Sequence, residues 1–191
     1  GNLVPRKGFD RLVDAMAGLA RRGRDARLVI VGRGPERAAL EARARALGVE
    51  DKVELVGEVW SDARLAAAFA ACDAFALASR TLHDPPAMEG FGVVYAEASY
   101  LGRPVVAGSS GGVPSAVVHE ETGLLVDPEG EDAGERFADA LDRVLTDPEL
   151  ARRLGEAGRA RALERFDWDL NARRVLEATS PSSRSGRCTF G

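Results

Sequence analysis

The chain has 191 residues, of which 45% are hydrophobic, and its formal net charge is -4 at pH 7. A chain of this length and apolar content can bury one substantial core. The acidic balance argues against a dedicated nucleic-acid-binding protein. No stretch is apolar enough to span a bilayer, and the first residues lack a signal-peptide pattern. Cys72 and Cys188 are too few for a disulfide framework or a metal site, so we expect a cytoplasmic protein without a bound metal.

Short apolar segments alternate with amphipathic ones along most of the chain. This alternation is typical of an α/β domain with a Rossmann-like, doubly wound parallel sheet. The patterns predict strands over residues 27–31, 52–56, 73–78, 104–107 and 124–126. They predict helices over residues 9–19, 36–47, 62–71, 91–101, 132–145, 148–164 and 168–178. Residues 81–88 read as a loop, because Pro85 and Pro86 cannot continue either kind of element.

The end of the chain differs in composition. Residues 179–191 are rich in Ser, Arg and Gly and have no apolar periodicity. We therefore expect one domain over residues 1–178, followed by a disordered tail over residues 179–191.

The most informative segment reads Glu-Gly-Phe-Gly-Val-Val-Tyr-Ala-Glu over residues 89–97. The predicted helix begins at Phe91, so residues 90–92 fall at its N-terminus. Free N–H groups and the positive end of the helix dipole make such a terminus a seat for a phosphate or a sugar oxygen. Glycines there let a ligand approach the backbone closely. Alternatively, Glu89 merely favours the helix dipole, and Glu97 caps the helix or pairs with an arginine.

Glu97 falls within the same predicted helix, at helical spacings from Val93, Val94, Ala98 and Leu101. A carboxylate in apolar company costs about 1–3 kcal/mol if it lacks a hydrogen-bonding partner. Hydroxyl groups of a ligand would supply that partner.

These two glutamates, with Gly-Phe-Gly after the first, resemble the motif of the retaining glycosyltransferases of family 4, which have the GT-B fold. The resemblance runs from residue 1 to about residue 178 and is nearest to phosphatidyl-myo-inositol mannosyltransferases. Matching segments occur in order over residues 1–10, 31–36, 56–59, 89–97, 102–107 and 121–126. The resemblance implies that the chain is the C-terminal, donor-binding half of such an enzyme, with Gly1 at the end of its first strand. It also implies that the helix over residues 168–178 lacks part of its packing partner, so we expect that helix to be mobile or to contact another copy.

The resemblance assigns roles to individual residues. Lys7 would contact the donor diphosphate and Glu89 the donor sugar ring, and these two are the candidate catalytic residues. A cation at the diphosphate offsets the charge that develops as this group leaves. Glu97 would bind the ribose hydroxyls, and backbone groups of the helix start would contact the sugar and the phosphates through Gly90, Phe91, Gly92 and Val93. The alternative for Lys7 is a solvated lysine that opens a helix, a place that the helix dipole disfavours.

One residue departs from the family pattern. Relatives carry an arginine directly after the first glycine as a second diphosphate contact, whereas this chain has Asn2. An amide can donate a hydrogen bond but cannot neutralise a phosphate. Either Arg6 compensates for the missing charge, or donor affinity and turnover are reduced.

The remaining donor-site candidates concern the nucleotide base. Val59, through its backbone, and Arg64, through its side chain, match positions that contact guanine in some relatives. A solvated arginine on a helix is the alternative for Arg64. Arg33 and Gly34 form a turn at the carboxyl end of a predicted strand, where α/β sheets place their ligands.

The implied function is the transfer of a hexose with retention, most of all mannose from GDP-mannose, to a lipid or saccharide acceptor. No cofactor is implied. The acceptor domain would lie upstream, so this chain would bind a nucleotide but transfer little sugar, and the full enzyme would associate peripherally with the inner membrane face. Two alternatives stay open: a non-catalytic nucleotide-binding or scaffolding module, and a GT-B-like sugar-nucleotide epimerase. The epimerase needs a further acid–base pair, which His83, Asp84 and His119 do not convincingly supply.

Overall fold

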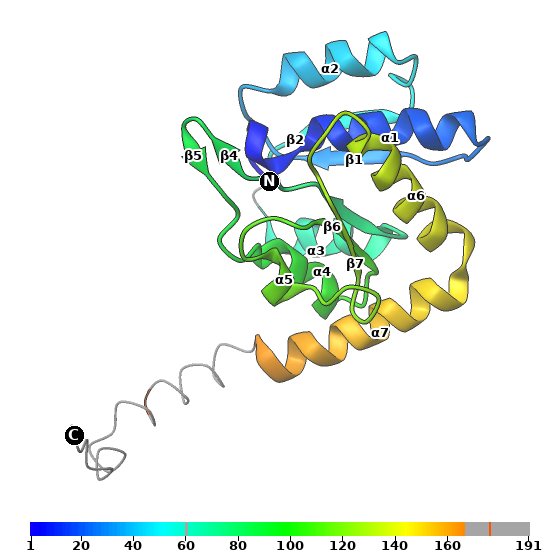
Figure 1. Ribbon diagram of the computed structural model, residues 1–191. Helices are drawn as coiled ribbons and strands as arrows, with labels where there is room; N and C mark the ends of the chain where they lie inside the picture. The colour runs from blue at the N-terminus through cyan, green and yellow to red at the C-terminus, as the bar shows by residue number, and fades with distance from the viewer. Residues whose placement is uncertain (60, 167–175, 177–191) are drawn as a thin grey trace.

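The structure is a computed structural model of the chain, and it describes residues 1–59, 61–166 and 176. Its strands and helices alternate as the sequence predicts (Figure 1). The strands are β1 (Leu28–Val31), β2 (Val53–Gly57), β3 (Phe75–Leu77), β4 (Leu82–His83), β5 (Pro86–Ala87), β6 (Val105–Gly108) and β7 (Leu124–Val126). The helices are the 3-10 helix η1 (Pro5–Lys7) and the α-helices α1 (Phe9–Arg21), α2 (Arg37–Ala46), α3 (Asp62–Ala71), α4 (Val93–Tyr100), α5 (Val113–Ala116), α6 (Ala133–Thr146) and α7 (Pro148–Arg165).

The strands outside the short hairpin pair in parallel. β1 pairs with β2, and β3, β6 and β7 form a second parallel group in that order. Each parallel pair is joined by a helical connection, since α2 links β1 to β2, α4 links β3 to β6, and α5 links β6 to β7. The predicted parallel α/β architecture is confirmed, although hydrogen bonds divide the parallel strands into two sheets, and β4 and β5 form a third.

Residues 1–8 connect the carboxyl ends of the two sheets. The Gly1 amino group donates a hydrogen bond to the Val31 carbonyl at the end of β1, at 2.6 Å. The Arg80 N–H, just after β3, donates to the Arg6 carbonyl at 2.9 Å. Gly8 has a φ of 64°, and a Cβ atom on it would lie 1.9 Å from the Ala78 carbonyl oxygen. A glycine is required here, and it brings η1 against the end of β3.

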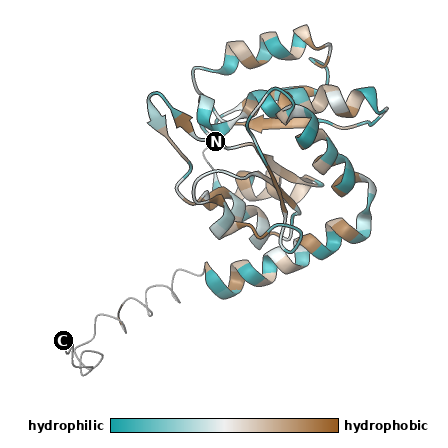
Figure 2. Ribbon diagram, viewed as in Figure 1, coloured by the Kyte–Doolittle hydropathy of each residue, from teal (hydrophilic) through white to brown (hydrophobic). Residues whose placement is uncertain are grey.

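Helices cover the second sheet on both sides, whereas β1 and β2 stay partly exposed, with Val29 at 53% and Val56 at 49%. Figure 1 shows β6 and β7 between α6 on one side and α4 and α5 on the other. The predicted apolar face of α1 is buried as expected, with Leu12, Met16 and Leu19 each at most 4% exposed. Figure 2 shows the hydrophobic colour concentrated on strands such as β1, whereas α2 and α7 alternate between hydrophilic and hydrophobic segments. Burial is deepest in β6, whose four residues are all buried, whereas β1 buries Ile30 alone of its four residues. The outer helices carry much of the polar surface.

Two predicted boundaries are wrong. Residues 81–88 are not a simple loop, because β4 and β5 form an antiparallel hairpin in which Leu82 faces Ala87 and His83 faces Pro86. A proline is compatible with such a short edge strand, whose outer side needs no hydrogen-bond donor. Helix α4 begins at Val93 rather than Phe91, because Gly92 has a left-handed backbone with a φ of 79°.

The predictions for the C-terminal helix over residues 168–178 and for the tail over residues 179–191 fall almost entirely outside the described residues. Within the part of the chain that the structure describes, no helix combines the length and the apolar character needed to cross a membrane. The same residues contain no cluster of His, Cys, Asp and Glu that could hold a metal ion.

Candidate functional site

The candidate site lies where the carboxyl ends of the parallel strands meet η1 and the segment before α4. The loop after β6 packs directly on this segment, and the Gly112 N–H donates to the Glu89 carbonyl at 2.9 Å. A Cβ atom on Gly112 would lie 1.7 Å from the Gly90 carbonyl oxygen. The glycine therefore allows two loops to meet at the edge of the sheet, where α/β proteins bind their ligands.

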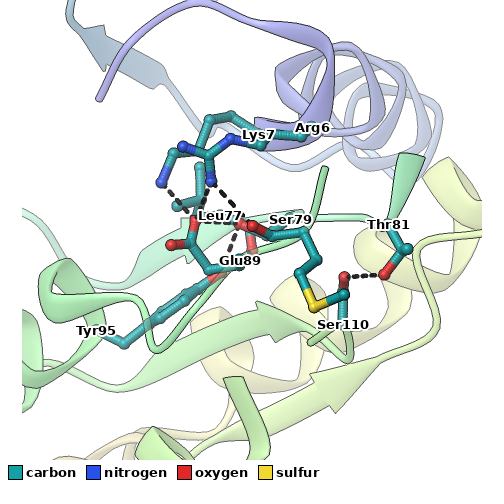
Figure 3. Close-up of polar contacts among 9 residues, drawn as sticks. Arg6, Lys7, Leu77, Ser79, Thr81, Glu89, Tyr95 and Ser110 are labelled. Atoms are coloured by element: carbon teal, nitrogen blue, oxygen red, sulfur yellow. Dashed lines mark hydrogen bonds and ion pairs between the residues drawn. The ribbon is translucent and has the colours of Figure 1, made fainter. Parts of the chain in front are cut away.

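A buried ion pair forms the centre of the site (Figure 3). The Nζ of Lys7 lies 2.5 Å from the Oε2 of Glu89, and the two side chains are only 13% and 10% exposed. Arg6 approaches the same oxygen through Nη1 at 3.3 Å, with 34% of its side chain exposed. Lys7 ends η1 and is not a solvated residue that opens a helix. Glu89 does more than favour a helix dipole, since two cations bind its carboxylate.

Two hydroxyl groups continue this network beneath Glu89. The Ser79 Oγ donates to the Glu89 Oε2 at 3.4 Å, and the Tyr95 hydroxyl lies 3.1 Å from the Ser79 Oγ and 3.0 Å from the Leu77 carbonyl oxygen. Ser79 and Tyr95 are each 0% exposed. Burial raises the pKa of the Tyr95 hydroxyl far above its ordinary value, so Tyr95 is a neutral hydrogen-bond donor.

Neither Ser79 nor Tyr95 was predicted as a site residue from the sequence. The available signals were a serine directly after a buried strand and a tyrosine, in place of a purely apolar residue, on the inner face of the predicted helix.

The N-terminus of α4 opens the site to solvent. Gly92 is its N-cap and no side chain caps the helix. Within the described part of the chain, the N–H groups of Val93 and Val94 donate to no acceptor. Gly90 is exposed, so the helix start is accessible to a ligand. As predicted, residues 90–92 stand at a helix terminus suited to an anion.

Phe91 uses its side chain for packing. Its ring meets the Phe166 ring edge to face, with centroids 5.0 Å apart and an interplanar angle of 76°. The side chain thereby ties the segment before α4 to the end of α7. The backbone of Phe91 remains beside the open helix start.

The prediction that Glu97 lies on an apolar helix face is wrong. Glu97 is exposed, and so are Val93 and Tyr100, which lie four residues before it and three residues after it. These three residues form a solvent-facing stripe of α4, so the carboxylate pays no burial cost. Glu97 still lies close enough to Gly1 to influence the pKa of its amino group. Burial lowers this pKa, the charge of Lys7 lowers it further, and the charge of Glu97 raises it.

The other candidate residues are more dispersed. Asn2 is exposed next to Leu3, and Gly34 packs on Leu3 so closely that a Cβ atom would lie 2.4 Å from the Leu3 carbonyl oxygen. Arg33 pairs with Glu58 at 2.7 Å, which links the loops after β1 and β2. The structure therefore brings Asn2, Arg33 and Gly34 to the carboxyl end of β1.

The two candidates for base recognition lie farther along the chain. Val59 is half-buried just after β2, and Arg64 is exposed on α3. No hydrogen bond or ion pair within the described residues joins Arg64 to the Glu89 network.

Comparison with known families shows to which family the chain belongs. The model of the family "Glycosyl transferases group 1" matches residues 1–161. The chain belongs to this family. A GDP-mannose-dependent alpha-(1-6)-phosphatidylinositol monomannoside mannosyltransferase from Mycobacterium tuberculosis is 43% identical over 175 residues, which cover 92% of this chain and 44% of that protein. The chain thus spans about half the length of the curated relatives it matches.

Solved structures of other proteins share this fold. HepE from Anabaena in complex with UDP superposes with a TM-score of 0.80 and 28% sequence identity, covering 93% of this chain and 46% of that one. The C-terminal domain of LpcC from Francisella tularensis matches with a TM-score of 0.75 and 22% identity, covering 88% of this chain and 84% of that domain. The chain therefore has the fold of the C-terminal half of a GT-B glycosyltransferase, as its resemblance to family 4 implied.

Proposed function

We propose that this group 1 domain binds the nucleotide-sugar donor of a retaining hexosyltransferase, and that the donor is GDP-mannose. The observation that carries the proposal is the buried carboxylate of Glu89, held by Lys7 and Arg6 next to the open N-terminus of α4. A diphosphate needs positive charge and N–H donors, whereas sugar hydroxyls need a fixed acceptor. This site offers both within one small region.

Lys7 and Arg6 are the proposed diphosphate ligands. An ammonium group carries three donors, so Lys7 can keep its contact with Glu89 while it binds a phosphate oxygen. Its charge would then stabilise the diphosphate as this group leaves the sugar, which is the catalytic role we assign to it. Arg6 is the more exposed cation. It is positioned to replace the charge that relatives obtain from an arginine at the position of Asn2.

Backbone and carboxylate groups would hold the rest of the donor. The N–H groups at the start of α4 face the diphosphate and the sugar, and Glu89 accepts a hydrogen bond from a sugar hydroxyl. Glu97, on the exposed stripe of α4, accepts from the ribose hydroxyls. The loops after β1 and β2 with helix α3 would surround the base, through Arg33, Gly34, Val59 and Arg64.

The choice of mannose and guanine rests on similarity. The M. tuberculosis relative is named as GDP-mannose-dependent, whereas the HepE structure contains UDP. At 43% against 28% identity, the former supports GDP-mannose more strongly. The acceptor, a lipid or a saccharide, would be bound by a domain that corresponds to the half of the relatives that this chain does not cover. A lipid acceptor would bring the whole enzyme to a membrane surface.

Calorimetry on the 191-residue chain tests donor binding. GDP, UDP and ADP are titrated separately, and GDP-mannose and UDP-glucose follow. We expect GDP and GDP-mannose to bind with a Kd between micromolar and millimolar, about 4–8 kcal/mol of binding free energy. If only UDP and UDP-glucose bind, the proposed base changes from guanine to uracil, and the proposed donor-binding role stands. No heat and no thermal shift with any of the five ligands would refute the proposed function.

A further inference from the structure

Among the residues that the structure describes, the polar contacts to the Glu89 carboxylate converge on one oxygen. Lys7, Arg6 and Ser79 each contact Oε2, at 2.5, 3.3 and 3.4 Å. No hydrogen bond within the described residues ends on Oε1. One oxygen is thus anchored from two sides, and the other is left for a further donor (Figure 3).

Tyr95 supports the same site through its ring. A Cβ atom on Gly92 would lie 2.3 Å from the Tyr95 Cδ2, so the ring packs directly against the N-cap of α4. The Phe75 ring meets the Tyr95 ring edge to face, with centroids 5.9 Å apart. The ring position is therefore fixed by packing, and a phenylalanine would satisfy this packing equally well. The hydroxyl group is buried with two acceptors in reach, the Leu77 carbonyl oxygen at 3.0 Å and the Ser79 Oγ at 3.1 Å, and the second of these leads to Glu89.

The number of available protons shows how the Tyr95 hydroxyl can act on Glu89 through Ser79. Tyr95 and Ser79 each have a single O–H donor. If Ser79 donated to Tyr95, its proton would not be available to Glu89. When Tyr95 donates to the Ser79 Oγ, the Ser79 proton can point at the Glu89 Oε2. The Glu89 carboxylate and the Leu77 carbonyl, which lies 3.0 Å from the Tyr95 hydroxyl, both only accept, so Leu77 and Ser79 share the single Tyr95 proton. In the arrangement in which Tyr95 donates to Ser79, the chain runs from Tyr95 through Ser79 to Glu89.

We propose that Tyr95 and Ser79 are positioning residues that fix the Glu89 carboxylate for the sugar part of the donor. The inference rests on the proposed function, because it assumes that the free Oε1 accepts from a donor sugar hydroxyl. Lys7 and Arg6 pull Oε2 from the side of η1, and Ser79 holds it from the end of β3. Without the two hydroxyls, the cations alone control the carboxylate, and it rotates towards them.

The test compares the sugar nucleotide with the bare nucleotide in two variants. In Tyr95→Phe and Ser79→Ala, we expect the Kd for GDP-mannose to rise about 3- to 10-fold, as one hydrogen bond predicts. The Kd for GDP, which lacks the mannose that would meet Glu89, stays within about twofold by the same reasoning. The matched controls are Tyr100→Phe, an exposed tyrosine on the same helix, and Ser99→Ala, a buried serine on that helix. Neither control changes the ratio of the two Kd values.

The ratio separates positioning from general support of the fold. A parallel loss of GDP and GDP-mannose affinity would mean that the hydroxyls only stabilise the domain, and an unchanged ratio in both variants would also overturn the inference. If the unmodified chain binds UDP and UDP-glucose instead, the same ratio is measured with that pair. If the unmodified chain binds none of these ligands, the proposed function fails first and the inference fails with it.

Discussion

The Nζ of Lys7 lies 2.5 Å from the Oε2 of Glu89, although the two residues are 82 positions apart in the chain. The contact joins η1 to the segment that opens α4, and both side chains are nearly buried. A buried ion pair contributes little net stability, because desolvation offsets the attraction. The presence of this ion pair at the ligand-binding edge of the sheet therefore fits a binding role better than a structural one.

Replacing Lys7 alone should show how much this ion pair contributes to the stability of the domain and how much to ligand binding. Removing one partner of a buried ion pair costs about 3–5 kcal/mol when the other charge is left alone. In Lys7→Met, Glu89 keeps Arg6 at 3.3 Å, so we expect unfolding in urea to show a smaller loss of about 1–3 kcal/mol. GDP affinity should fall about tenfold or more, because the diphosphate loses a charge-assisted contact.

The double variant Lys7→Met, Glu89→Leu completes the cycle. An apolar pair of similar size should recover most of the stability, since the one charge that loses its partner is that of Arg6, whose side chain is 34% exposed to solvent. Binding of GDP-mannose should remain as weak as in Lys7→Met or become weaker. Recovery of binding together with stability would show that the pair serves the fold and not the ligand.

Much of the fold could be predicted from the sequence, because apolar periodicity directly reflects burial. The spacing of Leu12, Met16 and Leu19 predicted the buried face of α1, and residues 105–107 are each 0% exposed in the predicted strand. The sequence pattern predicted Lys7 and Glu89 as site residues. Their direct contact could not be predicted, because a sequence pattern does not determine which distant loops meet.

The errors have local physical causes. Val93 is apolar and yet 57% exposed, so its presence one turn before Glu97 said nothing about burial. The start of α4 depended on Gly92, whose left-handed backbone a propensity argument cannot assign. Tyr95 was hidden among apolar neighbours, because its ring packs as an apolar residue and only its hydroxyl takes part in the polar network.

Glu97→Gln should weaken nucleotide binding without changing stability. The side chain is exposed, so the substitution removes no buried contact and the melting temperature should stay the same. A neutral amide is a weaker acceptor for the ribose hydroxyls, so we expect a loss of about 1–3 kcal/mol in GDP binding by calorimetry. Glu121→Gln, at an exposed glutamate in the turn before β7, is the control. Equal GDP affinity in the two variants would remove Glu97 from the site.

Gly92→Ala should destabilise the domain, whereas Gly90→Ala should not. Alanine at position 92 must adopt a φ of 79°, and its Cβ would meet the buried Tyr95 ring. We expect a loss of about 1–3 kcal/mol from backbone strain and overpacking, measured by urea unfolding. At Gly90, a Cβ atom would have no neighbour within 4 Å. Equal unfolding midpoints for the two variants would contradict the geometry of the α4 N-cap.

The buried Tyr95 hydroxyl should make stability depend on pH in the alkaline range. Burial raises its pKa above the ordinary value of about 10, so the unfolded chain loses this proton at a lower pH than the folded chain. Above about pH 10 the folded state binds more protons than the unfolded state, and stability falls by up to about 1.4 kcal/mol per pH unit. Below that pH both states keep the proton and the contribution is constant.

Tyr95→Phe removes this titration, and Tyr100→Phe serves as its control, because Tyr100 is 54% exposed. Urea unfolding is measured at pH 8.0 and at about pH 10.5, with the higher value chosen above the ordinary tyrosine pKa. The loss of stability between the two pH values should be smaller in Tyr95→Phe than in the unmodified chain or in Tyr100→Phe. An identical loss in all three proteins would mean that the Tyr95 hydroxyl ionises in the folded state as readily as in the unfolded chain, and the hydrogen-bonded chain to Glu89 would then lack its neutral donor.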